Sequence, residues 1–88
     1  MNKRLMFDGD GFEDYLYWQT QDRKTLKRIN QLIHDIARNG HEGIGKPEPL
    51  KYENQGYWSR RIDDEHRLVY RIEGNTIHIF SCRFHYDK

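Results

Sequence analysis

The chain has 88 residues and a formal net charge of +1, from 15 basic and 14 acidic side chains. This length suits a single domain and leaves no room for a second hydrophobic core. The near-neutral total excludes a protein that binds polyanions through its overall charge, so a nucleic-acid contact has to come from a local cluster. Aromatic residues make up 14% of the chain, and the apolar residues are clearly periodic, which excludes a disordered chain.

Cysteine usage and the apolar runs indicate the compartment. Cys82 is the single cysteine, so no internal disulfide can form, and we interpret it as a small, partly buried strand residue in a reducing compartment. The first eight residues hold too short an apolar run for a signal peptide, and no stretch approaches the length of a membrane span. We therefore expect a cytoplasmic protein without a membrane partner.

The first elements are predicted to be a short strand and a helix. Leu5–Phe7 is typical of a strand, and either Asp8 or Asp10 can cap the helix that follows. Helical spacing predicts which face of this helix meets the core, and that face consists of Phe12, Tyr15, Leu16 and Gln19.

A second helix is predicted by a longer apolar stripe. Asp22 is placed as its N-cap, and Asn39–Gly40 is a good C-terminal stop. The stripe follows the spacing i, i+3, i+4 and i+7, and it consists of Leu26, Ile29, Leu32, Ile33, Ile36 and Ala37. We assign this stripe to the core and give it no cofactor role.

Beyond Gly40 the pattern changes from helical to extended. Pro47 and Pro49 exclude a helix, and also a central strand position, around Glu48. Strands are expected to begin at Leu50–Tyr52 and then to cover Tyr57–Ile62, His66–Ile72 and Thr76–Phe84, joined by turns at 53–56, 63–65 and 73–75. The prediction is one α+β domain over residues 1–88, in which a short N-terminal strand and two helices precede an antiparallel meander and the helices cover one face of the sheet.

Four arginines concentrate in the predicted strands. We interpret this cluster as functional rather than as a mixed solvated surface, and it consists of Arg60, Arg61, Arg67 and Arg71. If the apolar strand faces cover the helices, alternation allows Arg61, Arg67 and His85 to meet on the open face. The strand register, which the sequence leaves open, decides whether they do.

Five segments match a known family in order and with nearly fixed spacing. They are Asp14–Trp18, Gly45–Lys51, Trp58–Ile62, Glu65–Tyr70 and His85–Tyr86. In these segments the chain closely resembles the YoeB/Txe toxins of the RelE/ParE superfamily, over about residues 12–86. The resemblance implies a small RNase-like α+β fold. It also implies a ribosome-dependent endonuclease that cleaves mRNA in the ribosomal A site.

The resemblance implies a role for each matched residue. The catalytic carboxylate falls on Glu48, the catalytic arginine on Arg67 and the catalytic histidine on His85. In that chemistry the glutamate takes a proton from a ribose 2′-hydroxyl, the histidine gives one to the leaving 5′-oxygen, and the arginine offsets charge on the phosphate. Supporting positions fall on Lys51, Arg61, Tyr86, Glu65 and Lys46.

Partners are implied by the same resemblance, while cofactors are not expected. Family members are held inactive by a co-expressed antitoxin of the YefM/Axe kind, whose flexible tail wraps the toxin, and the complex binds operator DNA through the antitoxin. The ribosome, mRNA and a possible second copy of the chain are the other implied partners. The five histidines are scattered without ligand spacing, so neither a metal site nor another cofactor is expected.

Other interpretations remain open for the separate residues and for the function. Glu48 alone could be a surface carboxylate, Arg61 and Arg67 could pair with the acids at 63–65, and such exposed pairs contribute roughly 0–1 kcal/mol. His85 and Tyr86 could be a solvated and a packing residue. A non-enzymatic ParE-like toxin that binds DNA gyrase, or a ribonuclease that ignores ribosomes, is the alternative function. Gyrase binding has no need of the glutamate, arginine and histidine together, which favours the mRNA nuclease.

Overall fold

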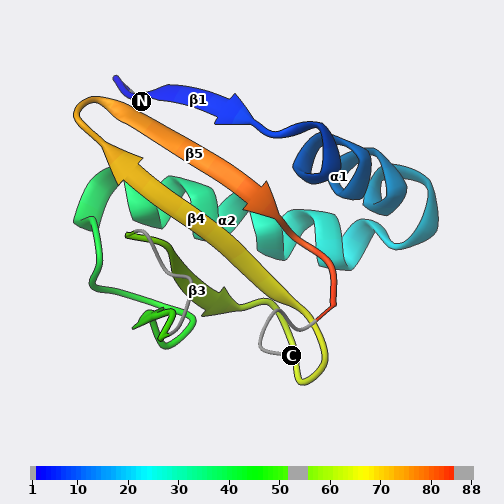
Figure 1. The fold of residues 1–88 in the computed structure, drawn as a ribbon. Helices are drawn as coiled ribbons and strands as arrows, with labels where there is room; N and C mark the ends of the chain where they lie inside the picture. Colours follow the sequence, from blue (N-terminus) through cyan, green and yellow to red (C-terminus); the bar gives the residue numbers. More distant parts are fainter. Residues whose placement is uncertain (1, 52–55, 85–88) are drawn as a thin grey trace.

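The described part of the chain, residues 2–51 and 56–84 of the computed structural model, forms five strands and two helices (Figure 1). In chain order these are β1 (Arg4–Phe7), α1 (Gly9–Gln21), α2 (Arg23–Asn39), β2 (Glu48–Pro49), β3 (Trp58–Arg61), β4 (Arg67–Glu73) and β5 (Thr76–Ser81). The arrangement confirms the predicted α+β class and the order of its elements.

The strands lie side by side in the order β1-β5-β4-β3-β2. The strands β2 to β5 are each antiparallel to the next, as expected for a meander. By contrast, β1 pairs in parallel with β5, with Arg4 opposite Thr76 and Phe7 opposite Ile79. The sheet is therefore mixed. A parallel neighbour needs a long crossover connection, and the two helices lie in the connection that leaves β1.

The strand that was expected to begin at Leu50 lies two residues earlier. β2 consists of Glu48 and Pro49, and the Leu50 amide still donates to the carbonyl oxygen of Tyr57 at 3.0 Å. Pro49 is tolerated because β2 is an edge strand, where the missing N–H costs no ladder bond. Tyr52 and the first three residues of the turn predicted at 53–56 lie outside the described residues.

The last strand ends at Ser81 rather than at Phe84 because its register shifts. Val69 lies opposite Ser81, whereas Tyr70 lies opposite Ile79, so Phe80 is an extra residue on β5. Such a bulge bends a strand and increases its local twist. The chain after Ser81 therefore leaves the ladder near the start of β4.

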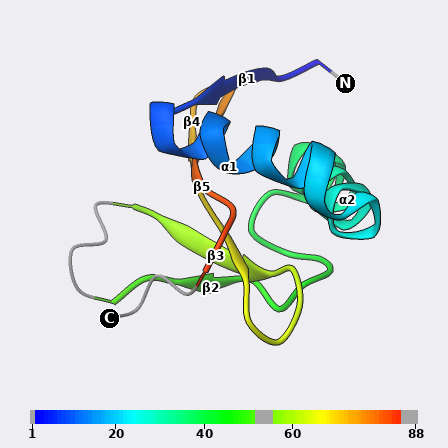
Figure 2. The same cartoon turned by 90° about the vertical axis from the view of Figure 1, so that its right-hand side faces the viewer.

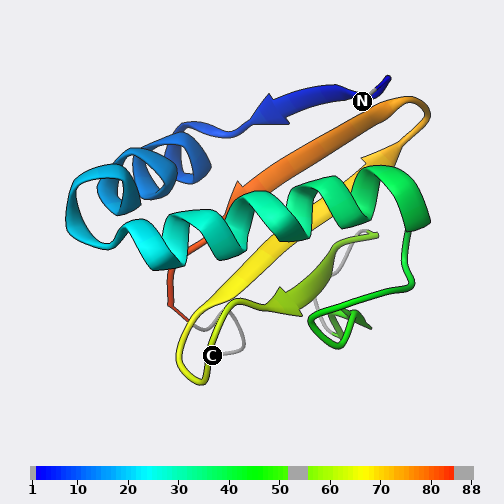
Figure 3. The same cartoon turned by 180° about the vertical axis from the view of Figure 1, so that it is seen from behind.

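Both helices lie on the same side of the sheet (Figure 2), and α2 runs across β4 and β5 (Figure 3). The Asp22 carboxylate caps α2 by accepting from the amides of Lys24 and Thr25 at 3.1 and 3.3 Å. Gly40 ends α2 with a φ of 69°, a conformation that glycine adopts without strain. Both ends of α2 were predicted. Among the described residues, no helix is long and apolar enough to span a bilayer.

The apolar stripe of α2 forms the core, as predicted. Four of its residues are fully or almost fully buried, and Leu26 and Ala37 pack at the margin of the core. The stripe contacts an apolar layer contributed by β4 and β5. These two layers consist of Ile29, Leu32, Ile33 and Ile36 on the helix and Leu68, Tyr70, Ile77 and Ile79 on the sheet.

The prediction for α1 was wrong in part. Phe12 and Leu16, expected in the core, are 47% and 38% exposed, whereas Gly11 and Trp18 are buried. Gly11 allows α1 to approach β5 so closely that a Cβ atom on it would lie 2.7 Å from the carbonyl oxygen of Ile79. The helix therefore turns its smallest residue towards the strand. Close backbone approach, rather than apolar spacing, sets its rotation.

A histidine in the loop that follows α2 packs against the sheet. The ring of His41 stacks on Trp58 with centroids 4.0 Å apart and an interplanar angle of 9°. Its Nδ1 lies 3.5 Å from the Tyr70 hydroxyl oxygen. Burial, and then the charge of nearby Arg60, lower the pKa of His41 below its ordinary value of 6.5. Burial and the nearby guanidinium therefore favour the neutral imidazole.

Substitution Gly11→Ala tests the close approach of α1 to β5. The added methyl group would meet the backbone of Ile79 and Phe80, which cannot move aside as a flexible side chain can. We expect a loss of about 1–3 kcal/mol in the free energy of unfolding, measured by urea denaturation. Gly9→Ala is the control, because nothing lies within 4 Å of its added Cβ, and it should keep or raise stability. Equal stability of the two variants would contradict the packing argument.

Substitution His41→Phe tests the histidine stack. Because the pKa of His41 is lower in the folded chain than in the unfolded chain, protonation favours unfolding as the pH falls below 6.5. The wild type should therefore lose more unfolding free energy than His41→Phe between about pH 7.5 and about pH 5.5. Phenylalanine keeps the stack on Trp58 and cannot take up a proton. The same pH dependence in both proteins would show that His41 makes no such contribution.

Candidate active site

The open face of the sheet carries three of the predicted site residues. Glu48 lies opposite Ser59, and Arg61 lies opposite Arg67. Directly opposite residues in antiparallel strands share a face, as do residues two apart in one strand, so Ser59 and Arg61 also share one. Glu48, Arg61 and Arg67 therefore point to the same side, away from the helices. The register thus brings together a carboxylate and two guanidinium groups from three neighbouring strands.

Arg67 is held at the start of β4 by backbone oxygens. Its Nη1 donates to the carbonyl oxygens of Asp63 and His66 at 2.8 and 3.1 Å. Its own amide donates to the carbonyl oxygen of Phe84 at 3.2 Å, and the Phe84 amide donates to Nδ1 of His66 at 2.7 Å. These bonds fix Phe84, the residue before His85 in the sequence, beside Arg67. His85 and Tyr86 themselves lie outside the described residues.

The turn between β3 and β4 satisfies its own polar groups locally. The Asp63 carboxylate accepts from the amides of Glu65 and His66 at 2.9 and 2.7 Å. Arg67 is bound to the carbonyl oxygen of Asp63 instead of to its carboxylate. The Glu65 side chain is exposed, with Oε1 3.6 Å from Nε2 of His66. An Arg67–Asp63 ion pair is therefore not what fixes this guanidinium.

The remaining predicted residues lie in β2 or close to it in the sequence. Glu48, Lys46 and Lys51 are exposed, and Lys51 directly precedes the residues outside the described part. Lys46 has a φ of 52°, and Gly45 before it has a φ of 81°. A positive φ is uncommon for a lysine, and it persists only where the surroundings hold the backbone. The position of Glu48 therefore depends on what fixes this loop.

A buried arginine on the helix-facing side of β3 holds the loop. Arg60 is fully buried, which corrects the interpretation that grouped it with the functional arginines. Its guanidinium donates to Oδ2 of Asp35 at 2.5 Å and to the Tyr70 hydroxyl at 3.3 Å. It also donates to three loop carbonyl oxygens, those of Gly40 at 2.6 Å, Glu42 at 2.9 Å and Ile44 at 3.0 Å. The alternation of side chains along the strand could have predicted this burial, because Arg60 lies on the same strand face as the apolar residues Trp58 and Ile62.

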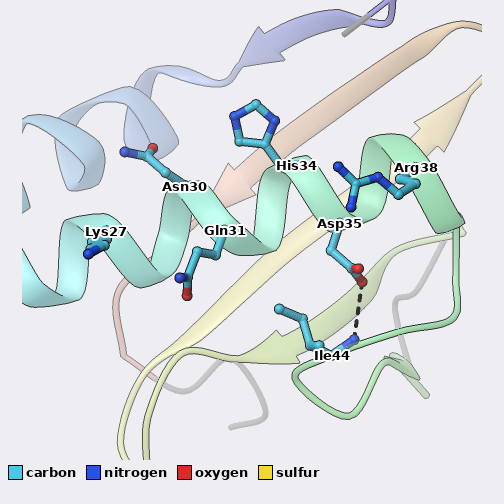
Figure 4. A pocket seen from close by; sticks show the side chains of 7 residues that line it. All are labelled: Lys27, Asn30, Gln31, His34, Asp35, Arg38 and Ile44. Carbon is cyan, nitrogen blue, oxygen red and sulfur yellow. Dashed lines mark hydrogen bonds between the residues drawn. The ribbon is translucent and has the colours of Figure 1, made fainter.

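Asp35 of α2 balances the charge of Arg60. Its Oδ2 also accepts from the Ile44 amide at 3.1 Å (Figure 4), and its Oδ1 accepts from Asn39 at 2.8 Å. Burial by itself raises the pKa of Asp35, but the hydrogen bonds from Arg60, Ile44 and Asn39 outweigh it and lower the pKa below its ordinary value. Asp35 thus remains ionised beside the buried guanidinium.

A surface pocket on α2 lies away from the open face. Figure 4 shows that its walls come mainly from the outer side of α2, together with the loop residue Ile44. The lining residues are Lys27, Asn30, Gln31, His34, Asp35, Arg38 and Ile44, and none of them is a predicted site residue.

Cys82 is unsuited to nucleophilic chemistry. Burial, and then the neighbouring charge of Asp14, raise the pKa of the Cys82 thiol to about 12. Its side chain is fully buried rather than partly buried, and it lies just beyond the end of β5 instead of on a strand. Within residues 2–51 and 56–84, no group of three or more His, Cys, Asp or Glu side chains is placed to hold a metal ion.

Comparisons with known proteins agree with the fold and with the sequence segments. Residues 7–86 match the family described as "YoeB-like toxin of bacterial type II toxin-antitoxin system". Toxin YoeB of Streptomyces coelicolor is 55% identical over 83 residues, which cover 94% of this chain and 99% of that protein.

Two solved structures from Staphylococcus aureus are similar to this chain along nearly its whole length. One is a YoeB dimer, with 52% identity and a TM-score of 0.93, and the other is a heterotetrameric YoeB-YefM toxin-antitoxin complex, with 52% identity and a TM-score of 0.90. Each match covers 98% of this chain and 100% of the other. This chain therefore belongs to the YoeB-like toxins of bacterial type II toxin–antitoxin systems.

Proposed function

We propose that this toxin is an endoribonuclease that cleaves translated mRNA in the ribosomal A site and so inhibits translation. The reaction uses acid–base catalysis without a metal, in which a ribose 2′-hydroxyl attacks the adjacent phosphate. The observation that carries the proposal is the strand register that sets Glu48, Arg61 and Arg67 on one open face of the sheet. Family membership supports the same function.

Glu48 and the two arginines are spaced to hold one phosphodiester between them. Glu48 and Arg67 lie two strands apart, about 10 Å across the sheet, and about 7 Å apart along the strands. Their long side chains can close on a ribose–phosphate unit in that gap. Glu48 accepts the proton of the 2′-hydroxyl, while Arg67 and Arg61 neutralise the developing phosphorane with planar forks that meet two oxygens at once.

The C-terminal residues supply the acid in this proposal. Phe84 is bound to His66 and Arg67, and His85 and Tyr86 follow it in the sequence. His85 protonates the leaving 5′-oxygen, because histidine exchanges protons readily near neutral pH. Tyr86 stacks on a base or donates to phosphate.

The remaining site residues set the local charge around the bound RNA in this proposal. Lys46 and Lys51 flank Glu48 in the sequence and supply positive charge that attracts the RNA phosphates. Glu65 lies in the turn that leads to Arg67. A local set of cations suits a chain whose net charge is only +1. The ribosome then brings the mRNA to the site, which the weak overall charge of the chain does not do.

The proposed partners follow from the relatives. The Staphylococcus aureus complex pairs YoeB with YefM, and we infer a YefM-like antitoxin for this chain, with operator DNA bound through that complex. The YoeB dimer supports a homodimer. We place the protein in the cytoplasm, as one domain. A ParE-like toxin that contacts gyrase is the rival, and it would cause DNA breaks instead of mRNA cuts.

Substitutions Glu48→Gln and His85→Ala test the catalytic assignment. Each removes one proton-transfer group, so each should lower the rate of mRNA cleavage by about 10²–10⁴-fold while the protein stays folded. Primer extension on mRNA translated with the purified protein measures the cuts. Glu13→Gln changes an exposed acid on α1 and should keep full activity. Full activity in both site variants would refute the assignment, and DNA breaks without mRNA cuts would favour the rival.

The pH dependence of cleavage tests the acid–base pair as a whole. The base acts deprotonated and the acid acts protonated, so the single-turnover rate should rise and then fall as the pH increases. The falling side should disappear in His85→Ala, and the rising side should disappear in Glu48→Gln. A wild-type rate that is flat across neutrality would contradict both roles.

A further inference from the structure

We propose that Arg60 is a positioning residue for cleavage: its buried guanidinium sets the place of Glu48 by fixing the loop that leads from α2 to β2. This inference rests on the proposed role of Glu48. It concerns how the carboxylate is held, and it assigns Arg60 no contact with RNA. Arg60 lies on the helix-facing side of β3, whereas Glu48 is on the open side.

The donors of Arg60 are used in full. A guanidinium carries five N–H groups, and the structure gives five acceptors for them. One is on α2 and one on β4, and the other three are on alternate residues of the loop. The acceptors are Asp35 Oδ2, the Tyr70 hydroxyl and the carbonyl oxygens of Gly40, Glu42 and Ile44. The loop is thus wrapped around a single side chain.

The fixed loop is coupled to Glu48 over a short stretch of stiff backbone. The Gly45 carbonyl oxygen accepts from the Arg61 amide at 2.6 Å, so the end of the loop lies directly on β3. A Cβ on Gly45 would lie 3.2 Å from that of Arg60. Only Lys46 and Pro47 then separate Gly45 from Glu48, and proline fixes its own φ. A shift of the loop therefore moves Glu48 with it.

Beyond its pairing with β3 and the bond from the Leu50 amide to the Tyr57 carbonyl oxygen, few contacts within the described residues hold β2 in register. It is a two-residue edge strand, both of its residues are exposed, and one of them is a proline without an N–H. If the guanidinium were lost, three loop carbonyl oxygens would lose this donor and Asp35 would lose one of its donors, and the loop would shift to satisfy them. A displacement of about 1 Å at a reacting group can cost about 100-fold in rate. The expected effect is therefore on the chemical step.

The first measurement compares Arg60→Lys with the wild type on mRNA-programmed ribosomes under single-turnover conditions. Lysine keeps the charge but has only three donors on one nitrogen, so it cannot span both sides of the loop. We expect the maximal rate to fall by about 10–100-fold, with the half-saturating ribosome concentration unchanged. Ile36→Val is the control, because it weakens the core on α2 without touching the loop, and it should keep the rate.

A double-mutant cycle separates positioning from general destabilisation. If Arg60 acts through Glu48, Arg60→Lys should cause no further loss in a Glu48→Gln background. The same fold-loss in both backgrounds would overturn the inference, as would a full rate in Arg60→Lys. Should Arg60→Lys fail to fold, Asp35→Asn replaces it in the same double-mutant cycle, because this variant keeps the shape of the side chain but removes its charge. The same two outcomes would then support or overturn the inference. A full rate in Glu48→Gln alone would instead refute the proposed function.

Discussion

The buried ion pair between Arg60 and Asp35 is the contact on which the rest of the structure depends. A charge without partners in the interior is strongly destabilising, so a buried guanidinium has to collect acceptors from every side. Arg60 takes them from α2, from β4 and from the loop between α2 and β2. The acceptors lie 10 to 25 residues from Arg60 in the sequence, and this one side chain fixes them relative to one another. The loop itself has no regular structure, so it would otherwise be defined poorly.

The sheet separates stability from chemistry by its two faces. Side chains on one face meet the stripe of α2 and form the core, and Arg60 is the polar exception there. In the described part of the chain no helix covers the other face (Figure 2), so charged side chains can remain hydrated on it. Glu48, Arg61 and Arg67 gather there without the cost of burying a charge. Their neighbours in sequence, on the opposite face, hold the backbone that carries them.

The return of the chain after β5 joins its end to the start of β4. The bulge at Phe80 turns the strand out of the ladder, and Trp18 of α1 then donates to the Cys82 carbonyl oxygen at 2.8 Å. Phe84 is bound next, by His66 and by the Arg67 amide. Contacts from α1 and from β4 thus guide the same short segment. Through this path the last residues of the sequence start from a point beside Arg67.

Sequence alone determined the features that depend on near neighbours. The stripe and both ends of α2, the turn between β4 and β5, and the edge position of Pro49 all follow from local spacing or from the chemistry of single residues, and the structure confirms them. The five segments that match the family in order and spacing also identified it, which the comparisons confirm. Alternation predicted that Arg61 and Arg67 could share a face of the sheet, and their direct pairing across β3 and β4 confirms it.

Only the tertiary structure decided the features that depend on distant partners. Three features depend on contacts between segments that the local pattern leaves independent. They are the parallel pairing of β1 with β5, the register that adds Glu48 to the open face, and the burial of Arg60. The prediction of which face of α1 meets the core was wrong for the same reason. The close contact of Gly11 with β5 sets the rotation of this helix, and its own apolar spacing does not. A one-residue change of register reverses every side chain of a strand, so local periodicity cannot choose between two faces until the neighbouring strand is in place.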